Sequence, residues 1–102
     1  MRYGYIGSMR TKPGRRDEVA GILLLGADSL RVIGCELYAV CTDPADADVI
    51  WVTEIWDSAE HHDGSLLLPD VNATIAATMP MLTGEFTRQE LTVVGGLGVR
   101  AG

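Results

Sequence analysis

The residues with the clearest chemical potential lie close together, where a carboxylate, an indole and two imidazoles follow one another along the chain. Glu54 and Trp56 stand two residues apart in the run 49–57, and His61 and His62 come shortly after it. A desolvated carboxylate can act as a general base, and so can a neutral imidazole near pH 7. The alternative is a structural Glu54 that an arginine or a backbone N–H satisfies, with Trp56 filling the core.

Only one of the two histidines can face a pocket, since adjacent residues on a helix point about 100° apart. Leu66 lies four residues beyond His62 on the same helical stripe, which indicates that His62 points inward. We therefore expect His62 to be a proton acceptor or hydrogen-bond partner and His61 to lie at the solvated surface. Adjacent histidines also cannot bind one metal as an i, i+4 pair, and we expect no metal and no cofactor.

Two further polar residues are candidates for contacts to a substrate. Asn72 falls early in the second long predicted helix and could reach a ligand carbonyl or dioxygen, or could simply cap that helix. Tyr38, like Tyr3 and Tyr5, is a strand tyrosine whose facing the sequence leaves open. Ser8 has no His and Asp partners at an interpretable spacing, so nucleophilic catalysis has no support.

These residues are positioned by a predicted order of strand, helix, strand, strand, helix, strand. We expect strands at 2–9, 35–42, 49–57 and 85–94, and helices at 15–25, 58–65 and 69–82. Asp57 and Glu60 resemble a capping box at the start of the middle helix. The order is typical of the ferredoxin-like α+β fold with a four-stranded antiparallel sheet. A single domain would occupy residues 1–95, with a flexible tail at 96–102.

Composition excludes several classes of protein. The net charge of −6 and the pI near 4.6 argue against a nucleic-acid partner and against attachment to an anionic membrane. No apolar run approaches the ~20 residues of a membrane span, so we expect a cytoplasmic protein. Cys35 and Cys41 are six residues apart on one predicted strand, roughly 20 Å, which favours two reduced thiols over a disulfide.

The third predicted strand also bears on assembly. Side chains alternate across a strand, so Ile50, Val52, Glu54 and Trp56 share one face, and the opposite face is also apolar. Two helical segments can cover only one face of a four-stranded sheet. An exposed apolar face of that size is unusual for a soluble monomer, so we expect a homodimer that packs sheet against sheet.

Four short motifs, in their order and spacing, resemble the antibiotic biosynthesis monooxygenase family: Lys12-Pro13-Gly14, Gly34-Cys35-Glu36-Leu37-Tyr38, Thr53-Glu54-Ile55-Trp56 and Glu60-His61-His62-Asp63. The resemblance covers nearly the whole chain. It implies a dimeric α+β barrel in which each subunit keeps a pocket between its sheet and its helices. It also implies that Trp56 lines that pocket with Glu54 close by, and the family's usual histidine position falls on Ser65 and Leu66 here.

The resemblance implies oxidation of a small phenol or quinol by dioxygen without a cofactor, or, in one branch of the family, oxidative opening of haem. The haem-opening branch has an Asn on the first strand, and this chain has none between residues 2 and 10, which argues against haem degradation. Our leading hypothesis is a monooxygenase with a small aromatic substrate and dioxygen as its partners. The alternative is a non-catalytic dimeric barrel that binds a small apolar ligand in a stress-related or structural role.

Overall fold

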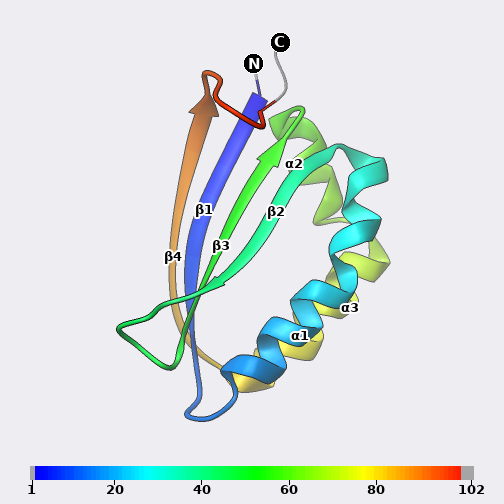
Figure 1. Cartoon of the computed structure of the whole chain (residues 1–102). Coiled ribbons are helices and arrows are strands. Elements are labelled where there is room, and N and C mark those ends of the chain that lie inside the picture. Colours follow the sequence, from blue (N-terminus) through cyan, green and yellow to red (C-terminus); the bar gives the residue numbers. More distant parts are fainter. Residues whose placement is uncertain (1, 100–102) are drawn as a thin grey trace.

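The computed structural model describes residues 2–99 and shows a four-stranded antiparallel sheet with its helices on one face (Figure 1). The elements are β1 (Arg2–Thr11), α1 (Arg16–Ala27), the 3-10 helix η1 (Asp28–Ile33), β2 (Cys35–Thr42), β3 (Val49–Trp56), α2 (Ala59–Ser65), α3 (Pro69–Thr78), the 3-10 turn η2 (Met79–Met81) and β4 (Leu82–Val93). The strand order β2-β3-β1-β4 confirms the predicted ferredoxin-like fold. The tail predicted at 96–102 extends into residues 100–102, which lie outside the described residues.

The helix-facing side of β3 forms the centre of the core. Ile50 and Val52 are buried in one cluster with Val19 and Leu23 of α1. Trp56 belongs to a second cluster near the other end of the sheet, together with residues of β1, η1 and β2. The alternation predicted from the sequence therefore holds, and it turns Glu54 toward the helices along with these apolar side chains.

The opposite face of the sheet has no helix over it within the described chain (Figure 1). Paired residues share a face, and the register brings Leu37 beside Ile55 and Cys41 beside Trp51 on this side. The face is therefore rich in apolar side chains that lack cover within one chain. This face is the one through which we expect a homodimer to form, and the homodimer stays a prediction.

The second long helix ends earlier than the sequence pattern indicated. A helix through Leu82 was expected, but α3 ends at Thr78, and a 3-10 turn leads into β4, which begins at Leu82. Pro80 lies in that turn, and a proline lacks the N–H that another helical turn needs. The apolar stripe continued past the proline because Met81 and Leu82 are core residues in another conformation.

The cap of α2 also differs from the expectation. Ser58, not Asp57, is the N-cap: its Oγ accepts a hydrogen bond from the His61 backbone N–H at 3.1 Å. Ser58 has the extended backbone typical of a capping residue, so the helix begins at Ala59. Asp57 Oδ1 instead lies 2.6 Å from His61 Nδ1.

A β-bulge places the two cysteines on opposite faces of the sheet. The register of β2 against β3 shifts between Cys35 and Leu37. The extra residue in β2 turns the side chain of Cys35 to the opposite face of the sheet from the side chain of Leu37. Cys35 therefore lies buried beside Trp56, whereas Cys41 is exposed on the opposite side of the sheet. Both thiols are free, as predicted.

Candidate functional site

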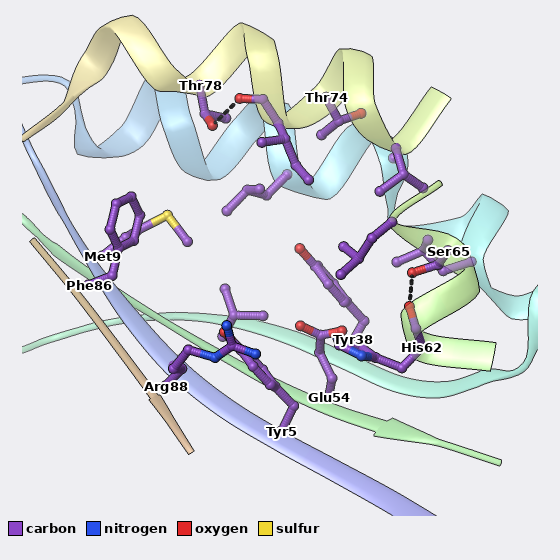
Figure 2. Close-up of a pocket in the computed structure, with 18 of the residues that line it drawn as sticks. Tyr5, Met9, Tyr38, Glu54, His62, Ser65, Thr74, Thr78, Phe86 and Arg88 are labelled. Carbon is purple, nitrogen blue, oxygen red and sulfur yellow. Dashed lines mark hydrogen bonds between the residues drawn. The ribbon is translucent and has the colours of Figure 1, made fainter. Parts of the chain in front are cut away.

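A cavity of about 740 Å³ lies between the sheet and the helices. All four strands contribute to its floor, α1 and α3 form its roof, and α2 closes one end (Figure 2). Polar and aromatic groups are gathered in one part of it, while aliphatic side chains such as Leu23, Val71 and Ile75 line the rest. A largely apolar cleft with a few convergent polar groups is the usual form of a small-molecule site.

His62 is held in an aromatic cage at the end of this cavity. The cap at Ser58 starts α2 so that His62, the fourth helical residue, turns inward and is only 6% exposed. Its ring centroid lies 4.8 Å from that of Tyr3, 5.5 Å from that of Tyr5 and 5.6 Å from that of Trp56. The ring is therefore fixed in position before any substrate enters.

Hydrogen bonds determine which nitrogen of His62 is available. Nδ1 lies 3.0 Å from Asp63 Oδ1, and the Ser65 hydroxyl donates to the His62 carbonyl at 2.6 Å (Figure 2). Because an ionised carboxylate can only accept, the Asp63 contact favours a proton on Nδ1. The lone pair then remains on Nε2, which can accept a proton from a bound molecule.

Glu54 places a carboxylate in the same part of the cavity. Its Oε1 accepts a hydrogen bond from the Trp56 indole N–H at 2.9 Å. Burial raises the pKa of Glu54, and the Trp56 hydrogen bond lowers it in part. Among the described residues, the hydrogen-bond donor to this carboxylate is the Trp56 indole, and no arginine or backbone N–H donates to it.

Two phenols flank Glu54 on neighbouring strands. Tyr5 of β1 and Tyr38 of β2 both pair with Glu54 in the register, so their side chains share its face. Burial is the main reason that the pKa of each phenol is raised. Both hydroxyls are therefore protonated donors at neutral pH. The Tyr38 hydroxyl makes no hydrogen bond to another described residue and lies in the cavity wall, where a substrate can reach it.

Two of the residues considered from sequence do not reach the cavity. Asn72 is exposed on α3, where Val71 faces the cavity instead, and the N-cap of that helix is Leu68 without any side-chain hydrogen bond. His61 is exposed and paired with Asp57. The structure thus brings together Glu54, Trp56, His62 and Tyr38, and leaves Asn72 apart.

Sequence reasoning did not identify three residues that line or support the site. Tyr5 and Arg88 line the cavity, and the buried Ser65 bonds to the His62 backbone. Alternation along β1 was a usable signal for Tyr5, but it could not tell which face meets the helices. Arg88 pairs with Gly7 across β1 and β4, a register that no local pattern reveals.

Within residues 2–99, no group of three or more His, Cys, Asp or Glu side chains gathers closely enough to hold a metal ion. The longest helix of that segment, α1, spans 12 residues. No helix there is both long enough and apolar enough to cross a membrane.

The sequence profile of the antibiotic biosynthesis monooxygenase family matches residues 2–77. The chain belongs to this family. Membership confirms the resemblance on which the sequence interpretation rested. The matched segment contains the cavity residues Tyr5, Glu54, Trp56 and His62, and it ends before β4, so Arg88 lies outside it.

Solved structures show the same fold as this chain. A protein of Chloroflexus aurantiacus J-10-fl, assigned provisionally to the family by name, is 46% identical with a TM-score of 0.84, over 94% of this chain and 96% of that one. One of Caulobacter crescentus CB15, named in the same way, is 20% identical with a TM-score of 0.84, over 92% and 91%. A third, of Deinococcus radiodurans, is 21% identical with a TM-score of 0.78, over 99% and 100%. The latter two show the fold alone, and no curated protein matches significantly.

Proposed function

We propose that the chain is a cofactor-independent monooxygenase that oxidises a small phenol or quinol with dioxygen. Family membership supports oxygenation, and the apolar cavity with its aromatic wall supports an aromatic substrate. The observation that carries the proposal is the buried His62 ring, caged by three aromatic side chains and with Nδ1 already paired to Asp63. Such a ring has one nitrogen left to take a proton from a hydroxyl in the cavity.

In the proposed reaction, His62 Nε2 accepts the proton of the substrate hydroxyl and leaves a phenolate. The apolar walls exclude water from this anion, which makes it a better electron donor to dioxygen. One oxygen atom bonds to a ring carbon, and the other leaves as water with the two hydrogens that the substrate loses. A phenol and one dioxygen thus give one quinone and one water, and no external reductant is needed.

Glu54 and the aromatic residues have separate roles in this scheme. The raised pKa of Glu54 makes it the alternative base, since its carboxylate binds a proton more readily than an exposed one. Trp56 and Tyr5 offer ring faces or edges for offset contacts with an aromatic substrate. Tyr38 can donate a hydrogen bond to the oxygen that develops negative charge.

The test is oxygen uptake with naphthols, anthrones and hydroquinones, measured for the wild type and for His62→Ala, His61→Ala and Trp56→Phe. We expect His62→Ala to lower turnover by about 10² to 10⁴, the usual loss for a general base. His61→Ala is the matched control, because it removes the neighbouring imidazole of the same helix at an exposed position. Trp56→Phe should weaken substrate positioning.

Two results would redirect the proposal. Equal turnover in the two histidine variants would exclude His62 as the base and transfer that role to Glu54. No oxygen uptake with any compound would favour the alternative, a non-catalytic barrel that binds a small apolar ligand. Direct binding of a non-oxidisable aromatic compound to the cavity distinguishes that alternative from a protein without a ligand.

A further inference from the structure

Arg88 differs from the other arginines in its partners. Six arginines lie among the described residues, and five of them form ion pairs: Arg2 with Glu36, Arg10 with Asp46 and Glu85, Arg15 with Glu18, Arg16 with Asp17, and Arg31 with Asp28. Arg88 has no carboxylate within ion-pair distance in the described chain. It lines the cavity instead, with its guanidinium carbon 5.9 Å from the centroid of the Tyr5 ring (Figure 2).

This contact leaves the hydrogen-bonding capacity of Arg88 unused. A guanidinium carries five N–H donors and no acceptor, and its planar fork matches the two oxygens of a carboxylate. Attraction to the face of the Tyr5 ring holds the cation without occupying those donors. In a chain with a net charge of −6, a cation without a carboxylate partner on the cavity wall is a specific attraction for an anion.

The floor of the cavity gives the Tyr5 ring room beside Arg88. Gly7, which pairs with Arg88, has no side chain, and a Cβ there would lie 2.8 Å from the Thr87 carbonyl oxygen and 3.1 Å from the Tyr5 ring. A larger residue would therefore displace the ring that Arg88 contacts. The absence of a side chain at Gly7 keeps Tyr5 flat against the sheet below the guanidinium.

Arg88 and the Glu54 carboxylate come from different strands of the cavity floor. Glu54 of β3 pairs with Tyr5 of β1, and Arg88 of β4 pairs with Gly7 of β1. Glu54 and Arg88 are therefore two strands apart across the sheet and two residues apart along it. Standard sheet dimensions put their Cα atoms about 12 Å apart. The Glu54 carboxylate repels a second anion, so a bound acid would direct its carboxylate to Arg88 and its opposite end to Glu54 and His62.

We propose that Arg88 binds a carboxylate of the substrate, which would then be a hydroxylated aromatic acid with its hydroxyl and carboxylate at opposite ends. That the bound acid is also a substrate rests on the oxygenation proposed above. The contact between Arg88 and an aromatic carboxylate does not depend on any reaction. Binding and turnover can therefore be tested separately.

Binding is measured first, by titrating 2-naphthoate and the neutral 2-naphthamide into the full chain and following heat or tryptophan fluorescence. We expect the wild type to bind the acid about tenfold more tightly than the amide, an advantage typical of a charge-assisted pair at a partly solvated site. Arg88→Gln should abolish this preference, and Arg88→Lys should keep only part of it because the fork is lost. Arg31→Gln is the control, since it removes the same charge from the surface.

Turnover is measured next with 6-hydroxy-2-naphthoate and 6-hydroxy-2-naphthamide. Arg88→Gln should raise KM for the acid far more than KM for the amide, whereas the control Arg31→Gln should leave both unchanged. Two results would overturn the role of Arg88. One is that Arg31→Gln loses the preference for the acid just as Arg88→Gln does. The other is that the wild type binds the acid and the amide equally. A preserved binding preference without oxygen uptake would overturn the proposed oxygenation and leave the Arg88 contact in place.

Discussion

Replacing Trp56 with Phe removes one well-defined interaction from the site. Trp56 is 1% exposed, and its indole N–H donates to the Glu54 carboxylate at 2.9 Å. A hydrogen bond to a charged group contributes about 1.5 to 3 kcal/mol to stability, and one to a neutral group about 0.5 to 1.5 kcal/mol. Phe keeps an aromatic ring in the core, so much of the remaining change is a loss of contacts that does not depend on pH.

The pH dependence follows from the pKa of Glu54. Burial raises that pKa in the folded state above its ordinary value of 4.5, so the folded protein loses stability as the pH rises from that value through the folded pKa. The Trp56 hydrogen bond lowers the pKa of Glu54, and removing it raises the folded pKa further. The stability lost by Trp56→Phe should therefore be smallest below pH 4.5 and grow by about 1 to 1.5 kcal/mol as the carboxylate ionises.

The assay is urea unfolding of the wild type and of Trp56→Phe, followed by far-ultraviolet circular dichroism at several pH values and one protein concentration. The same substitution in a Glu54→Gln background is the control, because an amide accepts the indole hydrogen bond but does not titrate. There the cost of Trp56→Phe should be independent of pH. The assigned hydrogen bond would be refuted if the stability lost by Trp56→Phe did not change with pH when residue 54 is Glu. It would also be refuted if that loss changed equally with pH when residue 54 is Gln.

Two further predictions concern assembly and the buried thiol. We expect a homodimer that joins the helix-free sheet faces and buries on the order of 2,000 Å² or more, and a stable monomer at micromolar concentration in sedimentation would contradict it. Cys35 should resist alkylation in the folded protein and react once urea unfolds it, since burial raises the pKa of its thiol to about 11. Mass spectrometry of labelled peptides measures this, and equal labelling of Cys35 in both states would count against the prediction.

The strand and helix order could be predicted because each element carries its own local signal. Alternating side chains identified β2 and β3, and the apolar stripe beginning at Pro69 identified α3. The errors arose where the backbone changes conformation without a change in hydrophobicity. The stripe beyond Thr78 continued into η2 and β4, and the bulge after Cys35 leaves no trace in the apolar pattern.

The candidate site was predictable only as far as one segment of chain extends. Glu54 and Trp56 are neighbours on one strand face, and the helical stripe through Leu66 indicated the inward direction of His62. Tyr5 and Arg88 join them through pairings between strands distant in sequence, so their positions depend on register. Asn72 was placed on the right helix, but periodicity alone did not fix which side of its first turn meets the sheet.

The side chains of β1 explain why one cavity has two chemically different ends. Along its helix-facing side, Tyr3 and Tyr5 cage His62, and Gly7, the next position on that side, has no side chain. The tyrosines bury the His62 ring, while the Tyr5 ring lies over Gly7 and contacts the Arg88 side chain from β4. Because the step from Tyr5 to Gly7 is a fixed repeat of the strand, the sheet sets the distance between the Cα atoms of Glu54 and Arg88, whereas α2 sets the position of His62. Under the role proposed for Arg88, strand geometry therefore fixes the length of an acid that spans Glu54 and Arg88, and the position of α2 fixes its reach to His62.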